Sequence, residues 1–180
     1  AQPWLFMGTQ KWFVSHGHMD HIAALPVYVA RRRMMKMAPP TIYLPESTIE
    51  PIRKILWQFS KMDRGRLPCE LIPLTGGEEI DLSRELVATV VETSHTIPSL
   101  GFVNWDRRKK LKPEFLDLPG EKIRDLRLGG VEITNEIRVP LVAYMGDCRP
   151  GSLDIEPAVY EAKILILEIT FVSPKHRKDK

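Results

Sequence analysis

The sequence predicts one α/β domain spanning residues 1–180, in which strands outnumber helices. Its length and a hydrophobic content of 43% allow one sizeable buried core. Short apolar runs rich in β-branched residues alternate with segments whose apolar residues recur at helical spacing. Polar side chains able to bind metals follow directly after several of the apolar runs, which is the usual place for site residues in layered α/β folds.

The first third of the chain alternates between strand and helix. Two segments have the apolar spacing of a helix, and the first carries Pro26 near its start, where proline is best tolerated. The second begins at Ser47, a capping residue that is followed three residues later by Glu50. The elements expected here are a strand at residues 11–14, a helix at 22–37, a strand at 41–44 and a helix at 47–62.

Beyond residue 63 the sequence predicts mostly strands, because runs of β-forming residues are bounded by turn residues. Residues 106–130 differ, since they are highly charged and contain several prolines and glycines, so we expect a loop, a short-helix excursion or an insertion there. The last two apolar runs are uninterrupted, which is typical of buried strands. The expected strands cover 70–74, 79–82, 86–93, 101–105, 141–145 and 164–169, with a short helix around 157–162.

Composition argues against several classes of protein. No run approaches the roughly 18 apolar residues of a membrane span, and the N-terminus lacks the pattern of a signal peptide, so we expect a cytoplasmic protein without a membrane partner. The two cysteines, Cys69 and Cys148, are far apart and are expected to be free thiols. A net charge of +3 suits an anionic substrate but is too small to indicate nucleic-acid binding by itself.

A histidine-rich segment is the strongest chemical signal. Residues 16–21 contain three of the five histidines of the chain, together with Asp20. On a helix His16 and His18 would point in nearly opposite directions, whereas an extended turn at Gly17 lets both side chains converge on one point. Histidine nitrogens and aspartate oxygens bind Zn²⁺-type ions at about 2.0–2.2 Å, and this segment has enough of them for two adjacent ions. The alternative is a solvated loop.

Two further polar residues follow apolar runs. His95 comes after the run at residues 87–91, and Asp147 comes after the run at 141–145. Taken alone, His95 would equally well be a capping or turn residue, and Asp147 would more often be a turn residue before Pro150. Both become stronger metal-ligand candidates when they are considered together with residues 16–21.

Together these residues resemble the metal-binding signature of the metallo-β-lactamase fold, namely His16-x-His18-x-Asp20-His21, His95 after one strand, and Gly146-Asp147 after a later strand. Longer blocks around them are similar to those of ribonuclease Z, the endonuclease that trims tRNA 3′ ends. The blocks are residues 13–26, 94–102, 146–150 and 168–171. The resemblance implies an αββα sandwich with a dinuclear metal site at one edge between its sheets, here with N- and C-terminal pieces expected to be missing.

The resemblance also implies a role for each residue of the site. It assigns one zinc ion to His16, His18 and His95, and a second to Asp20 and His21. Asp147 would bridge the two ions, because a carboxylate has two acceptor oxygens and can span ions about 3.5–4 Å apart. Asp20 would in addition be the catalytic residue that orients a metal-bound hydroxide. Mn²⁺ or Fe²⁺ would fit the same mixed ligand set.

The C-terminal part of the chain departs from the ribonuclease Z pattern. The family supplies a final histidine to the second metal well after the block that contains Glu168 and Thr170. Only His176 follows here, and it lies early, among basic residues that are typical of a solvated tail. The family also has a histidine where this chain has Leu167, and loss of that imidazole would change how Asp20 is oriented.

The RNA-binding features are weaker than the metal signature. The charged segment 106–130 occupies the place of the long arm with which ribonuclease Z grips tRNA, but it is short. The basic runs 31–33 and 107–110 would contact phosphates or, as is more common, form solvated faces. Three aromatic side chains that could stack on bases are expected in the core instead. They are Trp57, Phe59 and Trp105.

These observations favour a zinc-dependent hydrolase that resembles ribonuclease Z and cleaves a phosphodiester, with a tRNA 3′ trailer as the substrate that the resemblance implies. The first alternative is a hydrolase of a small ester, thioester or cyclic phosphodiester. The second is a non-catalytic metal-binding or nucleic-acid-binding module. Ribonuclease Z is commonly a dimer, so a homodimer is expected from the resemblance alone.

Overall fold

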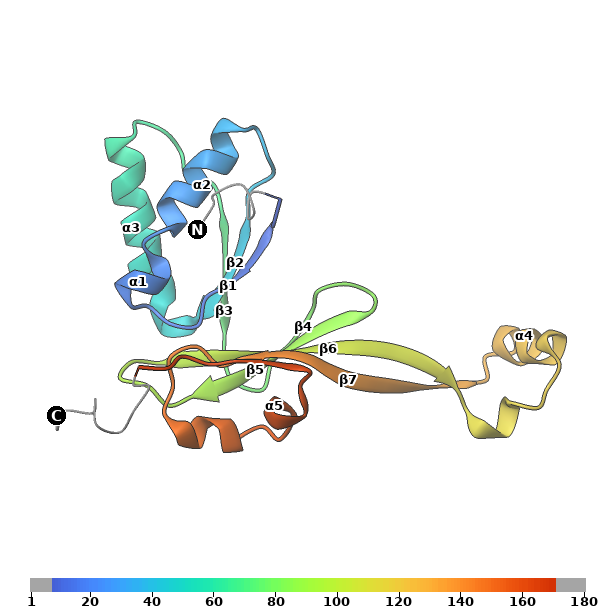
Figure 1. Cartoon of the computed structure of the whole chain (residues 1–180). Helices are drawn as coiled ribbons and strands as arrows, with labels where there is room; N and C mark the ends of the chain where they lie inside the picture. The colour runs from blue at the N-terminus through green and yellow to red at the C-terminus, as the bar shows by residue number, and fades with distance from the viewer. Residues whose placement is uncertain (1–7, 171–180) are drawn as a thin grey trace.

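The computed structural model describes residues 8–170 and contains two β-sheets that pack against each other (Figure 1). The first sheet is parallel, with the strand order β1-β2-β3, and comprises Lys11–Phe13 (β1), Thr41–Pro45 (β2) and Glu70–Leu74 (β3). The second sheet has the order β4-β5-β6-β7-β8 and is antiparallel except for its last pair. Its strands are Glu79–Asp81 (β4), Leu86–Thr93 (β5), Ser99–Leu111 (β6), Thr134–Tyr144 (β7) and Ile164–Ile166 (β8).

Helices cover the outer face of each sheet. The first sheet carries α1 (Met19–Ile22), α2 (Leu25–Met34) and α3 (Ile49–Met62), which follows a 3₁₀ turn at Glu46–Thr48; the second carries α5 (Ala158–Glu161), after a 3₁₀ turn at Pro150–Asp154. Side chains alternate across the first sheet, so that Ile42 and Leu44 face the helices while Tyr43 faces the second sheet. The layers therefore run helix, sheet, sheet, helix, which confirms the expected αββα sandwich. Of the helices within residues 8–170, none combines the length and apolar content that crossing a bilayer requires.

The helix expected over residues 22–37 is divided into α1 and α2. Pro26 lies in the first turn of α2, where its missing N–H costs no hydrogen bond. A helix continuous from α1 would place the proline ring against the carbonyl group of Ile22, four residues earlier. The chain therefore ends one helix at Ile22 and begins the next at Leu25.

The strands expected to end at residue 105 and to begin at 141 are both much longer. β6 continues to Leu111 and β7 begins at Thr134, and the two form an antiparallel hairpin that Figure 1 shows projecting from the sandwich. A 3₁₀ turn at Pro113–Phe115 and the helix α4 (Gly120–Leu128) connect the strands at the tip. Charged residues suit both faces of a two-stranded ribbon in water, so no apolar alternation marks these strands in the sequence.

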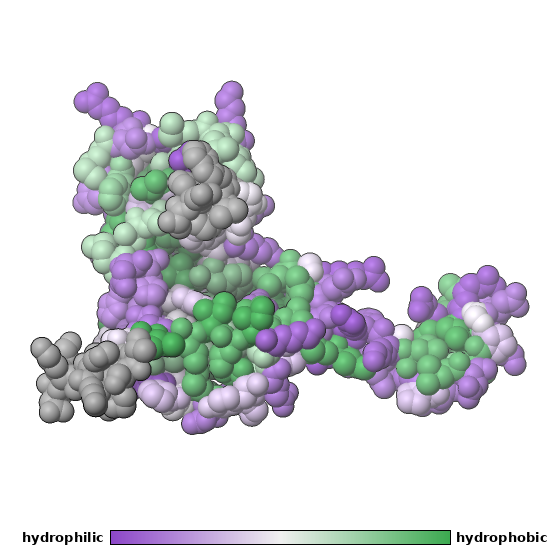
Figure 2. Space-filling model, viewed as in Figure 1, coloured by the Kyte–Doolittle hydropathy of each residue, from purple (hydrophilic) through white to green (hydrophobic). Residues whose placement is uncertain are grey.

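Two expectations about burial were wrong. β8 forms, but within the described residues it is an edge strand with exposed apolar side chains, and a hydrophobic area over the second sheet is visible in Figure 2. Trp57 and Phe59 are 53% and 44% exposed, because the buried stripe of α3 runs through Ile52 and Leu56 and leaves its flanks in water. Trp105, in contrast, packs against the core beneath α5.

Candidate metal centre

The histidine-rich segment leaves the first sheet as an extended turn. The backbone N–H of Val14 still donates to the carbonyl oxygen of Tyr43, which continues the β1–β2 ladder. Residues 15–18 then lie outside any helix or strand, and α1 begins directly after His18. His16 is completely buried whereas His18 is partly exposed, as expected for residues that lead from the core into an open site.

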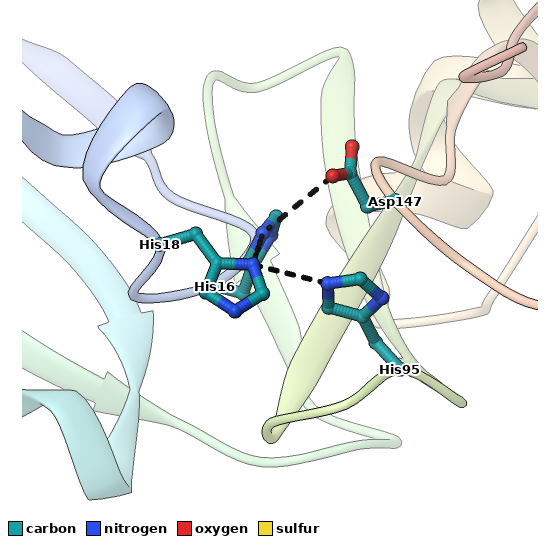
Figure 3. Close-up of side chains that lie close together, drawn as sticks. All are labelled: His16, His18, His95 and Asp147. Carbon is teal, nitrogen blue, oxygen red and sulfur yellow. Dashed lines mark hydrogen bonds and ion pairs between the residues drawn. The ribbon is translucent and has the colours of Figure 1, made fainter. Parts of the chain in front are cut away.

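The other two loops meet this turn at the same edge of the sandwich. His95 lies in the loop between β5 and β6, and Asp147 lies in the loop after β7. Since β5 and β7 both run antiparallel to β6, their C-terminal ends lie at the same edge of the second sheet. The side chains of His16, His18, His95 and Asp147 accordingly converge (Figure 3).

These four residues form a first group of possible metal ligands, with one ligand atom from each within 4.8 Å of the others. Nε2 of His16 lies 3.0 Å from Nδ1 of His18 and 3.8 Å from Oδ2 of Asp147. Nε2 of His95 lies 3.1 Å from Nδ1 of His18. Three imidazole nitrogens and one carboxylate oxygen are a donor set that suits Zn²⁺ and related divalent ions, so the residues present fit such a metal.

A second group shares Asp147 with the first and adds two residues from α1. It consists of Asp20, His21 and Asp147. Nε2 of His21 lies 3.4 Å from Oδ2 of Asp20 and 3.4 Å from Oδ2 of Asp147. Because the same carboxylate belongs to both groups, it is placed as a bridge between two ions would be.

The electrostatic environment keeps His16 ready for metal binding. Burial, and to a smaller extent the neighbouring His21 ring, lowers the pKa of His16 to about 4, although the carboxylate of Asp147 acts in the opposite direction. The imidazole of His16 is therefore neutral at neutral pH. The neutral ring is the form that can donate a lone pair to a metal ion.

The structure leaves Glu168 and Thr170, the residues of the C-terminal block, outside these groups. Glu168 and Thr170 are exposed, and the hydroxyl of Thr170 donates a hydrogen bond to the Glu168 carboxylate. Neither belongs to a ligand group within residues 8–170. His176 lies outside the described residues.

Two residues at the site have contacts that the sequence did not predict. Ser15 is buried beside His16, with its Oγ 3.0 Å from Nδ1 of that ring. Gly146 has a φ of +59°, and a Cβ atom built on it would lie 3.0 Å from Cβ of Ser15. Both residues lie in blocks that resemble ribonuclease Z, and each is next to a candidate ligand, but no role was assigned to either because neither residue type is a common metal ligand.

Comparisons with known proteins identify the family of the chain. The family model described as the beta-lactamase superfamily domain matches residues 12–179. The protein named tRNase Z TRZ1 of Arabidopsis thaliana is 39% identical over 173 residues, which cover 93% of this chain and 62% of that protein. The nuclear ribonuclease Z of Triticum aestivum is 44% identical over 125 residues, covering 69% of this chain and 71% of that protein.

The similarity extends to an archaeal protein. The ribonuclease Z of Pyrococcus furiosus is 30% identical over 194 aligned residues, which cover 96% of this chain and 61% of that protein. The chain thus spans less than two thirds of the Arabidopsis and Pyrococcus relatives. The wheat relative, of which it covers more than two thirds, and the domain match determine the family. The chain belongs to the beta-lactamase superfamily and, within it, to the ribonuclease Z family.

Proposed function

We propose that this chain carries the catalytic centre of a metal-dependent phosphodiesterase that cleaves RNA, with the 3′ trailer of a tRNA precursor as its substrate. The observation that carries the proposal is the pair of ligand groups that share Asp147. Two divalent ions bound there would activate water and neutralise charge that develops on the phosphate during an in-line displacement. The names of the relatives, tRNase Z and ribonuclease Z, support RNA as the substrate.

The proposed roles of the side chains follow from how far each is buried. The buried His16 and the loop residues His18 and His95 would hold one ion in a fixed place. His21 and Asp147 would hold the other, which is nearer to solvent. Asp20 is the most exposed of the set, so its carboxylate would be able to accept a hydrogen bond from an attacking water while it helps to hold the second ion.

The projecting hairpin supports an RNA substrate rather than a small one. Its outer half carries Lys109, Lys110 and Lys112, which are cations suited to a phosphate backbone. Arg107 and Arg108 at its base pair instead with Asp81 and Asp106. We therefore assign RNA contact to the outer hairpin and its tip, in the place where the family has its tRNA-gripping arm.

The other basic run does not support RNA contact. Arg32 is buried, and its guanidinium donates hydrogen bonds to the carbonyl oxygens of Ala38 and Thr9. Arg33 pairs with Asp63. These side chains connect α2 to neighbouring segments. Arg32 therefore neither belongs to a solvated face, as was expected to be more common, nor is available to contact a phosphate.

Cleavage of two substrates tests the proposal. The protein should release the trailer from a tRNA precursor, and Asp20→Ala should abolish that release, because the variant lacks the carboxylate that orients water. Bis(p-nitrophenyl) phosphate is the comparison substrate, since it offers a phosphodiester without RNA. Activity on this compound alone would exclude the tRNA assignment in favour of a small-substrate hydrolase. No activity on either substrate, with metal bound, would favour the non-catalytic module.

The native metal is proposed to be Zn²⁺, because imidazole dominates the first ligand group. Metal analysis of the protein purified without added metal should find two zinc ions per chain. A dominant content of manganese or iron would contradict this assignment, and at most one tightly bound ion would contradict the dinuclear site.

Two further assignments rest on the family resemblance. A homodimer is proposed, and sedimentation equilibrium should give about twice the chain mass of 20.7 kDa; a monomer at micromolar concentration would refute it. A cytoplasmic location is also proposed, although the relatives include one named nuclear and one named chloroplastic. Imaging of a tagged protein checks the compartment.

A further inference from the structure

Ser15 contacts the histidine loop, the Asp147 loop and the start of β6, the strand that follows the His95 loop. Its hydroxyl oxygen lies 3.0 Å from Nδ1 of His16, in the first loop. Its backbone carbonyl accepts a hydrogen bond from the N–H of Leu100, just after the His95 loop, at 2.9 Å. Its Cβ and Oγ lie close to Gly146, immediately before Asp147: a Cβ atom built at position 146 would lie 3.0 Å from Cβ and 3.1 Å from Oγ of Ser15, so a side chain there would require Ser15 to shift.

The contact with His16 involves the ring nitrogen that faces away from the ligand group. A neutral imidazole has one N–H and one nitrogen with a free lone pair. Nε2 of His16 faces the ligand group, at 3.0 Å from Nδ1 of His18, while Nδ1 faces the hydroxyl of Ser15. If Nδ1 carries the proton and donates it to Oγ of Ser15, the lone pair of Nε2 is directed at the metal.

Burial makes this contact hard to replace. His16 is fully buried and Ser15 is 3% exposed, so bulk water cannot take over as the acceptor for Nδ1–H. The opposite tautomer would direct an N–H into the ligand group, where it would block a coordination position. A serine hydroxyl can accept the bond without adding charge, and the close approach of Gly146 leaves little room for a larger acceptor.

We propose that Ser15 is a positioning residue that holds His16 as its Nδ1–H tautomer, with Nε2 directed at the first metal ion. The same residue fixes the distance between the histidine loop and the Asp147 loop through its packing on Gly146. The inference rests on the proposed metal site, but it concerns a property of the protein that is measurable without any substrate.

The tautomer is the direct test, and it needs no variant to be decisive. Long-range ¹H–¹⁵N correlation spectra of the metal-free protein at pH 7.5 distinguish a protonated Nδ1 from a protonated Nε2. The expected result for His16 is a protonated Nδ1, both without metal and with Zn²⁺ bound. A protonated Nε2 in the metal-free protein would overturn the proposal, even if the site binds metal.

Measurements of metal affinity test whether the contact between Ser15 and His16 strengthens metal binding. Ser15→Ala removes the acceptor and should weaken Co²⁺ or Zn²⁺ binding, measured by competition with a chelator, by about tenfold or more. The matched control is Ser99→Ala, because Ser99 is equally buried but its Oγ has no hydrogen-bond partner within residues 8–170. The control should bind metal as tightly as the unchanged protein. Unchanged affinity in Ser15→Ala, or equal weakening in both variants, would refute the positioning role.

A second substitution distinguishes loss of the hydrogen-bond acceptor from loss of the folded structure. Ser15→Cys keeps nearly the same shape but is a weaker acceptor, so it should retain the folded spectrum and still lose part of the affinity. For cleavage, both Ser15 variants should lower kcat and leave KM nearly unchanged, since Ser15 touches no substrate. If the unchanged protein cleaves neither RNA nor the model diester, the proposed function fails alone, and the tautomer and affinity results still decide the role of Ser15.

Discussion

Asp147 is the residue on which both ligand groups depend, because its Oδ2 lies 3.8 Å from Nε2 of His16 and 3.4 Å from Nε2 of His21. Asp147→Ala should therefore remove the second ion and weaken binding of the first, for which His16, His18 and His95 remain, whereas His21→Ala should weaken only the second. Each ion contributes several kcal/mol of transition-state stabilisation, so cleavage should fall at least about 10³-fold in Asp147→Ala. Metal analysis of the dialysed variants, together with their rates, checks this.

The matched control for that experiment is Asp154→Ala. Asp154 lies near the same loop but pairs with the hydroxyl of Tyr160 on the surface, and it belongs to neither ligand group. It should keep both ions and full activity. Two ions retained in Asp147→Ala would contradict the bridging assignment.

Gly146 should be intolerant of any side chain. Its φ of +59° disfavours a residue with a Cβ, and that atom would lie 3.0 Å from Cβ of Ser15. Gly146→Ala should lower the free energy of unfolding by about 1–3 kcal/mol, measured by denaturant titration of the metal-free protein. The substitution should also weaken metal binding, because the Asp147 loop has to move away from Ser15.

Gly77→Ala distinguishes the effect of backbone strain from the effect of packing against Ser15. It also has a positive φ, +87°, but a Cβ built on it meets nothing within 4 Å. Gly77→Ala should show the cost of backbone strain alone, with metal affinity unaltered. Equal losses of stability in Gly77→Ala and Gly146→Ala, without loss of metal in the latter, would mean that packing against Ser15 is unimportant.

At the scale of elements, the local sequence pattern was sufficient to predict those helices and strands whose burial fixes which of their residues must be apolar. The strand at Leu86–Thr93 and the helix ending at Met62 form as predicted. The strand is buried on both faces and reads as a continuous run of β-forming residues, whereas one side of the helix packs in the core and repeats at helical spacing. The β6–β7 hairpin was missed, since residues 106–111 and 134–139 are held by pairing with each other and face water on both sides. Composition could not distinguish a charged two-stranded ribbon from a charged loop, because both are rich in the same residue types.

The β6–β7 hairpin should affect the binding of RNA but not the cleavage of the phosphodiester bond. Replacing residues 112–133 by a two-residue Asn-Gly turn would join β6 and β7 directly and remove α4. Because the metal loops lie at the opposite end of these strands, cleavage of bis(p-nitrophenyl) phosphate should be unchanged. Cleavage of a tRNA precursor should fall mainly through a higher KM, measured by steady-state kinetics.

Charge reversal without shortening is the control for that deletion. Lys109→Glu together with Lys110→Glu keeps the hairpin but repels phosphate, so it should raise the KM for the tRNA precursor and reduce its dependence on salt. If either variant lowers activity on the small diester as much as on RNA, the hairpin contributes to the fold of the site rather than to RNA binding.

At the scale of the whole molecule, the sequence could predict the local half of the candidate site but not its assembly. Residues 16–21 are close because they are adjacent in the chain, and no periodicity relates them to Asp147, which is 131 positions away from His16. That contact depends on how the two sheets pack and on which strand ends share an edge. Only the family resemblance carried this information, and it could not reveal Ser15, whose role depends on contacts within 3–4 Å.

The assembly predicts that metal stabilises the whole sandwich. The first ligand group joins the end of β1 in one sheet to loops that follow β5 and β7 in the other, so an ion bound there links both halves of the molecule. At a metal concentration 100 times the dissociation constant, binding to the folded state alone contributes about 2.7 kcal/mol, which raises Tm by about 5–11 °C in a chain of this size. Differential scanning calorimetry with Zn²⁺ and with a chelator measures the shift, and Asp147→Ala should show a clearly smaller one. An equal shift in that variant would locate the stabilising ion elsewhere, and no shift in the unchanged protein would mean that the folded protein does not bind the metal at that concentration.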